Sequence, residues 1–145
     1  MSIDQRLGHH LKRAEQELIA AKHAALRPFK LSTPQYTVLL VLWEEPGLSG
    51  AGLARRCLVT PQTMSSVLGT LEGRGLVERK PHPIHHHILE ARLTRSGRAL
   101  LTKADVPAMA VEQALDAEFS AAEREQLVGL LARCTTALAK VQTEG

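Results

Sequence analysis

The chain has 145 residues, 44% of them hydrophobic and 23% charged, with a formal net charge of +3. This composition excludes global disorder and favours a single domain, residues 1–145, with a core of its own. Aromatic residues make up only 3% of the chain, so the core must consist mainly of Leu, Val and Ala, which suits closely packed helices. The mild positive charge permits nucleic-acid binding without requiring it.

Targeting, redox and catalytic signals are sparse. The longest apolar run, residues 38–43, falls far short of the roughly 18 apolar residues of a membrane span, and the polar N-terminus does not form a secretory signal. We therefore expect a cytoplasmic protein that has no membrane partner. Cys57 and Cys134 lack metal-type spacing and are most simply buried thiols. No pattern indicates a metal, a cofactor or a catalytic nucleophile, so we expect no enzyme.

Two helices are predicted in the first third of the chain. The first lies within residues 7–27, where apolar residues recur at alternating spacings of four and three, and it ends before Pro28. In the second, Thr33 is the expected N-cap and Pro34 the first helical residue. The second helix stops at Pro46-Gly47. Its expected buried stripe is Tyr36, Leu39, Leu40 and Trp43.

A helix-turn-helix is predicted from Ser49 to Gly75. Ser49 caps a short helix over residues 51–57, and a second helix begins at Thr60-Pro61. One face of the second helix is apolar, with Met64, Val67, Leu68 and Leu71 at i, i+3, i+4 and i+7. The opposite face carries Gln62, Ser65, Ser66, Gly69, Thr70 and Gly73. Side chains this short can enter a major groove, so the second helix is predicted to read duplex DNA.

A β-hairpin and two long helices complete the chain. Residues 76–79 and 89–93 are predicted strands, the latter with Leu89, Ala91 and Leu93 inward. Two prolines in residues 80–83 exclude regular structure there. A helix follows Thr94 and is expected to kink at Pro107. Ser120 and Glu123 form a capping box for the last helix. The apolar stripe of that helix is Leu127, Leu130, Leu131, Cys134, Leu138 and Val141.

These elements predict a mainly α fold with a small two-stranded β wing. Residues 31–94 form a winged helix-turn-helix DNA-binding lobe, and residues 1–27 and 95–145 form a helical dimerisation region. The terminal helices carry more apolar surface than this lobe could cover, so a second copy is expected to bury it in a two-fold dimer. Such dimers place two reading helices in successive major grooves about 34 Å apart, which predicts a palindromic DNA site.

Several stretches together resemble the MarR family of transcription regulators: residues 31–36 (LSTPQY), 52–54 (GLA), 60–65 (TPQTMS), 71–79 (LEGRGLVER) and 93–98 (LTRSGR). Their order and spacing match the family over essentially the whole chain. The resemblance implies a homodimeric repressor, less often an activator, that binds an inverted repeat near its own promoter. It also implies release by a small, often aromatic or phenolic, ligand that lies in a crevice between the dimerisation helices and the DNA-binding lobe.

The expected DNA contacts fall into two sets. The reading-helix set is Thr60, Gln62, Thr63, Ser65, Ser66 and Thr70. The phosphate and wing set is Arg55, Arg56, Arg74, Lys80, His82, His85, His86, His87 and Arg92. Phosphate contacts contribute salt dependence rather than sequence choice. One arginine can instead form a structural ion pair, with Arg79 or Arg92 beside Glu78 or Glu90 the best candidates.

The wing departs from the family pattern. Most members carry a wing arginine that enters the minor groove, whereas residues 85–87 of this chain are three histidines. Without an arginine, reading of A·T tracts by the wing should be weaker. Consecutive strand residues point to opposite faces, so a shared metal ion is the less favoured alternative to an exposed wing tip. A third hypothesis is that histidines, with ordinary pKa values near about 6.5, tighten DNA binding as the pH falls from about 7.5 to 6.

Effector and redox sites are less defined. The candidate ligand residues are His9, His10, His23, Tyr36 and Trp43, although surface histidines and core aromatics are the commoner explanation. Redox control through the two cysteines is an alternative, but neither has an obvious activating neighbour. A winged-helix module that binds protein rather than DNA also remains open.

Overall fold

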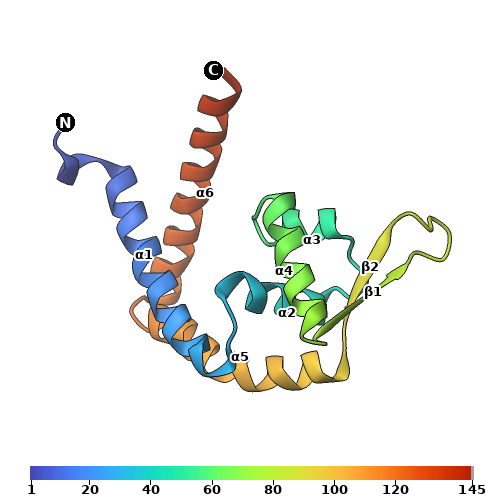
Figure 1. Ribbon diagram of the computed structural model, residues 1–145. Coiled ribbons are helices and arrows are strands. Elements are labelled where there is room, and N and C mark those ends of the chain that lie inside the picture. The colour runs from blue at the N-terminus through green and yellow to red at the C-terminus, as the bar shows by residue number, and fades with distance from the viewer. Residues whose placement is uncertain (145) are drawn as a thin grey trace. The chain divides into compact units, whose positions relative to one another are not determined.

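The computed structural model describes residues 1–144 and contains six α-helices and one hairpin in that range (Figure 1). The first helices are α1 (Leu7–Leu26), α2 (Thr33–Glu44), α3 (Gly50–Arg56) and α4 (Pro61–Gly73), with short 3-10 turns at Ile3–Gln5 and Arg27–Phe29. The strands are β1 (Val77–Pro81) and β2 (Leu89–Leu93), followed by α5 (Arg95–Asp116) and α6 (Ala121–Glu144). The predicted fold class is confirmed.

The chain divides into two compact units, Met1–Ala108 and Met109–Gly145, with the boundary inside α5. The first unit holds the hydrophobic core, which is built from the end of α1, from α2, α3 and α4, from both strands and from the first half of α5. Its most deeply buried large side chains are Leu26, Leu39, Leu42, Leu53, Met64, Leu68, Leu71 and Val38. Three of these eight lie on α4, so the predicted reading helix is held firmly by its inner face.

Helix α2 differs from its prediction in two respects. Its N-cap is Ser32 rather than Thr33, because Ser32 and Gln35 form a reciprocal capping box. The Gln35 N–H donates to Ser32 Oγ at 3.2 Å, and the Ser32 N–H donates to Gln35 Oε1 at 3.0 Å. The predicted stripe is also partly wrong: Trp43 is 53% exposed and Leu40 is half-buried. Helix α2 contacts α1, α3, α4 and β2, so neighbours on several sides bury it, and its buried set is Tyr36, Val38, Leu39, Val41 and Leu42.

The hairpin is antiparallel, and its pairing runs from Val77–Leu93 to Pro81–Leu89. The expectation that Lys80 and Pro81 lie outside regular structure is wrong. Pro81 is the last residue of β1, where a missing N–H removes little from the ladder. Leu89, predicted to point inward, is 42% exposed, because the outer end of the hairpin projects away from the helices (Figure 1).

A short segment before α3 pairs with the free edge of β2. The Gly47 N–H donates to the Ala91 carbonyl, and the Ala91 N–H donates to the Leu48 carbonyl, both at 2.9 Å. Gly47 has φ +92, and a Cβ there would lie 2.8 Å from Glu90 Oε2. Only glycine fits this turn without strain. The contact ties the start of the helix-turn-helix to the base of the wing.

The second unit contains the end of α5 and all of α6. Ser120 and Glu123 form the predicted capping box: the Ser120 N–H donates to Glu123 Oε1 at 3.0 Å, and the Glu123 N–H donates to Ser120 Oγ at 3.1 Å. The apolar stripe of α6 is exposed in the single chain, from Leu127 at 37% to Val141 at 68%. Cys134 is half-buried, so the expectation of a buried thiol is wrong at this position.

Candidate nucleic-acid interface

The predicted reading helix α4 starts as its sequence indicates. The Thr63 N–H donates to Thr60 Oγ1 at 3.1 Å, and the Thr60 hydroxyl donates to Thr63 Oγ1 at 3.0 Å. Thr60 is therefore the N-cap, and Pro61 occupies the first helical position, where no N–H is needed. The cap fixes the direction in which the first turn of α4 leaves the core.

The two faces of α4 separate as predicted. Met64, Val67, Leu68 and Leu71 are buried. All six predicted reading residues are exposed: Thr60, Gln62, Thr63, Ser65, Ser66 and Thr70. The structure thus presents them together on one helix that faces solvent, although their contact with bases stays a prediction.

The C-terminal end of α4 is fixed by contacts that the sequence pattern does not reveal. Gly75 has φ +70, the left-handed conformation predicted for this position. The guanidinium of Arg74 donates to the carbonyls of Lys30 at 2.7 Å and Phe29 at 3.2 Å. A phosphate contact by Arg74 would require these two hydrogen bonds to break. Arg74 therefore anchors α4 to the segment that precedes α2.

The other predicted phosphate contacts differ in how free they are. Among residues 1–144, the exposed guanidinium of Arg55 has no hydrogen-bond or ion-pair partner. Arg56 lies 2.8 Å from Glu45 and 3.8 Å from Glu44, and its hydrogen bond with Glu45 raises its pKa further above neutrality. Arg55 is thus the better placed of the two for an intermolecular anion.

Wing arginines take part in ion pairs of the kind that the sequence suggested. Arg92 lies 3.4 Å from Glu90, as expected. Arg79 donates to Glu72 of α4 at 2.7 Å rather than pairing with Glu78, and so ties the wing to the reading helix. Lys80 lies 3.9 Å from Glu78, is mostly exposed and keeps its charge near the outer part of β1.

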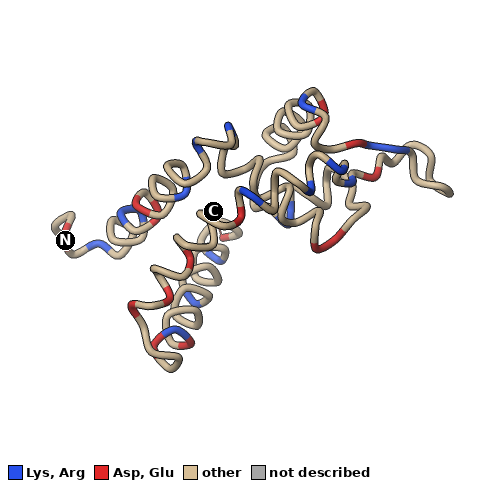
Figure 2. The backbone as a smooth tube through the Cα atoms, turned by 90° about the horizontal axis from the view of Figure 1, so that it is seen from below, with Lys and Arg blue, Asp and Glu red and all other residues tan. Residues whose placement is uncertain are grey.

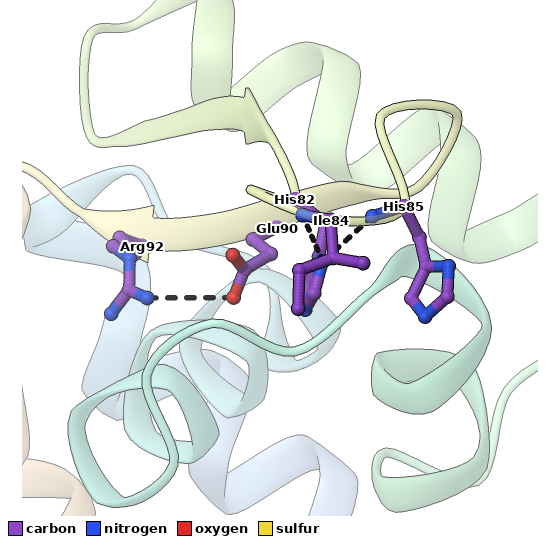
Figure 3. A network of polar contacts seen from close by, with 5 residues as sticks. All are labelled: His82, Ile84, His85, Glu90 and Arg92. Atoms are coloured by element: carbon purple, nitrogen blue, oxygen red, sulfur yellow. Dashed lines mark hydrogen bonds and ion pairs between the residues drawn. The ribbon is translucent and has the colours of Figure 1, made fainter.

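The wing loop beyond Lys80 contains no Lys, Arg, Asp or Glu through Leu89, and Figure 2 shows this tip in tan, with both basic and acidic positions on the hairpin behind it. His82 organises the loop (Figure 3): its Nδ1 accepts the backbone N–H of Ile84 at 3.1 Å and that of His85 at 3.0 Å. The rings of His82 and His85 are stacked with centroids 5.3 Å apart. His86 and His87 are exposed. Within residues 1–144 no three metal-binding side chains lie where they could share an ion.

His82 has a structural role in this loop, because its Nδ1 accepts two backbone N–H groups. We expect the amide NMR signals of Ile84 and His85 to shift and to lose protection from exchange in His82→Ala, which removes the acceptor. The hypothesis that acid tightens DNA binding through the wing stays a prediction.

The matched control is His82→Asn, whose side-chain oxygen can still accept. Its Ile84 and His85 amides should stay protected. Amides that are as well protected in His82→Ala as in the wild type would contradict the role assigned to His82.

The candidate ligand residues do not converge. On α1, His10 Nε2 lies 2.8 Å from the Asp4 carbonyl oxygen, whereas His23 is exposed and His9 half-buried. Tyr36 is buried on α2, and its hydroxyl donates to Asp105 of α5. Trp43 borders a cleft of about 400 Å³ between α2 and α5, and none of the three histidines of α1 lines it. The cleft is lined by Leu40, Trp43, Glu44, Leu101, Thr102 and Asp105.

Cys57 does not show the features of a redox sensor. Cys57 is half-buried at the end of α3, and burial raises the pKa of its thiol, an effect that the charge of Arg56 only partly offsets. A raised pKa lowers the fraction of reactive thiolate.

Comparison with known proteins agrees with this geometry. A family model described as MarR family matches residues 29–95. The HTH-type transcriptional repressor Rv2887 of Mycobacterium tuberculosis is 36% identical over 131 residues, which cover 90% of this chain and 94% of the repressor.

Two solved structures have the same fold. The transcriptional repressor CouR bound to a 23-mer DNA duplex has a TM-score of 0.82 at 28% identity, covering 92% of this chain and 94% of CouR. Rv2887 in complex with p-aminosalicylic acid has a TM-score of 0.68 at 35% identity, covering 90% of this chain and 98% of Rv2887. The chain therefore belongs to the MarR family and is a DNA-binding transcriptional regulator of the MarR type.

Proposed function

We propose that the protein is a homodimeric repressor whose α4 helices enter successive major grooves of a palindromic operator. The observation that carries this proposal is the exposed polar face of α4 on a helix capped by Thr60 and anchored at its other end by Arg74. Short hydroxyl and amide side chains on such a helix can approach base edges closely. Arg55 and Lys80 would hold the lobe to phosphates on either side.

We assign dimerisation to residues 1–27 and 95–145 and DNA binding to residues 31–94, within one functional domain. Helix α6 supports this division, because Leu130 is 53%, Leu138 56% and Val141 68% exposed in the single chain. A stripe of large apolar side chains on one helix is costly in water and marks an interface. A second copy of this chain is the occupant that two-fold operator recognition requires.

A mobility-shift assay on the DNA upstream of the protein's own coding region tests the proposal. Binding should weaken at least about tenfold between 50 and 200 mM salt, because phosphate contacts release counterions. Sedimentation should show a dimer at the same concentrations. A monomer, or the absence of any salt-dependent complex, would remove the repressor proposal.

We further propose that a small aromatic acid binds the cleft between α2 and α5 and releases the DNA. Trp43 offers an exposed indole, and the Arg98 guanidinium lies 5.8 Å from its ring centroid. An aromatic ring could stack on the indole while its carboxylate pairs with Arg98. Asp105 lines the same cleft and accepts a hydrogen bond from the Tyr36 hydroxyl. A ligand in the cleft would therefore lie beside a hydrogen bond that joins α2 to α5. The proposal is supported by the p-aminosalicylic acid complex of Rv2887.

Trp43→Ala should separate effector response from DNA binding. With salicylic acid as the probe, we expect the concentration that releases half of the DNA to rise about fivefold, since one aromatic contact contributes about 1 kcal/mol. Affinity for DNA without the probe should stay unchanged, because Trp43 is half-exposed and lies outside the core. Release by salicylic acid that is unaffected by Trp43→Ala would place the effector elsewhere.

The proposed role requires no catalysis, since recognition of DNA and of an effector is sufficient for it. None of the helices within residues 1–144 is both long and apolar enough to cross a membrane. We place the regulator in the cytoplasm, because its partner is DNA.

A further inference from the structure

Leu58, in the turn between α3 and α4, combines two unfavourable features. Its φ is +58 and its side chain is 91% exposed. The turn is a Schellman motif, in which the Val59 N–H donates to the Ala54 carbonyl at 3.1 Å and the Leu58 N–H to the Arg55 carbonyl at 3.4 Å. Leu58 occupies the left-handed position of this motif, where glycine is the usual residue.

The rest of the fold does not benefit from this leucine. A branched side chain in the left-handed region costs free energy relative to glycine, and a fully exposed Leu side chain gains nothing from the core. Elsewhere the chain uses Gly47 and Gly75, or the polar Lys30, at positive φ. Leu58 is the one large apolar side chain in this conformation within residues 1–144. Strain that the folded protein does not repay points to a role in binding.

The position of Leu58 favours DNA as the group that covers it. The free guanidinium of Arg55 precedes it by one helical turn, and the Thr60 cap of the reading helix follows two residues later. The turn is therefore continuous with the DNA-binding surface. A leucine gains nothing from phosphate oxygens, whereas the 5-methyl group of thymine is the apolar group that the major groove displays.

We propose that Leu58 is a specificity-determining residue that packs against the 5-methyl group of a thymine in each half-site. This inference rests on the DNA-binding function and adds a base contact outside the polar face of α4. It also explains why glycine does not occupy the turn, since glycine would relieve the strain but lose the contact.

Leu58→Gly tests the proposal. The wild-type protein first selects a duplex from a random pool, and the selected sequence is then prepared once with thymine and once with uracil. Uracil lacks only the 5-methyl group. Wild-type affinity should fall on the order of tenfold on the uracil duplex, the effect expected of two buried methyl groups. Leu58→Gly should bind both duplexes equally, at the lower affinity, while its melting temperature rises by a few degrees because the strain is gone.

Lys30→Gly is the matched control, because it relieves the same backbone strain at another site. It should melt higher than the wild type and keep the full preference for thymine. A Leu58→Gly protein that still prefers thymine as strongly as the wild type would overturn the inference, and so would one that loses its dimeric state. If the wild type selects no DNA at all, the proposed function itself fails.

Discussion

Ser66→Glu is expected to abolish specific DNA binding, with a loss of at least about 100-fold in affinity. Ser66 is exposed near the middle of α4, opposite the buried Val67 and Leu68. A carboxylate at this position would enter a groove bordered by phosphates, where like charges repel and no counter-charge is at hand. Binding can be measured by fluorescence anisotropy on a duplex selected by the wild-type protein.

The control for this substitution is Ser96→Glu. Ser96 is exposed in the first turn of α5, which begins where β2 ends, away from the wing loop. The substitution adds the same charge as Ser66→Glu, and an acidic residue is favourable in the first turn of a helix. It should bind DNA nearly as well as the wild type, and both variants should melt and sediment like the wild type. Wild-type affinity in Ser66→Glu would show that α4 does not enter the groove.

Gly97→Ala is expected to destabilise the protein strongly, although alanine is normally the better helix former. A Cβ at Gly97 would lie 2.1 Å from the carbonyl oxygen of Leu76. That carbonyl also accepts the Thr94 N–H at 3.1 Å. A shift of the Leu76 backbone away from the new Cβ would therefore weaken this hydrogen bond. Overpacking of this kind costs about 1–3 kcal/mol, which should lower the melting temperature by on the order of 5–10 °C.

Gly69→Ala is the control, and we expect it to raise the stability of the protein where Gly97→Ala lowers it. Gly69 lies inside α4, and a Cβ there would meet no atom within 4 Å. This variant should be stabilised by up to about 1 kcal/mol, the difference in helix propensity. Thermal unfolding followed by circular dichroism distinguishes the two. Equal stability of the two variants would mean that α5 does not pack closely on Leu76.

Local signals in the sequence were sufficient for the helix-turn-helix. The caps at Ser49 and Thr60, the apolar spacing of α4 and the glycine at position 75 each depend on a few neighbouring residues. Such signals act within one helix and can be read in one dimension. The bounds of β2 were equally predictable, because its alternation is local.

The errors in predicted burial and side-chain contacts arose where the environment of a residue depends on distant neighbours. Trp43 and Leu89 fit an apolar period, yet Trp43 lies at a cleft and Leu89 on the projecting part of the wing. The periodicity of a single helix does not show how many elements surround it. The same reason explains why Arg74, predicted at phosphate, is hydrogen-bonded to two backbone carbonyls.

The sequence by itself determined the family, the order of the elements and the exposed polar face of α4, because caps, periods and motifs are properties of short segments. Only the tertiary structure decided which charged and polar groups remain available. It engages Arg56, Arg74 and Arg92 with other groups and, among residues 1–144, leaves the guanidinium of Arg55 without a partner. It also makes His82 an acceptor and exposes Leu58 in a strained turn. These outcomes depend on which atoms come within about 3 Å of each other. The order of residues along the chain does not show which distant residues meet in space.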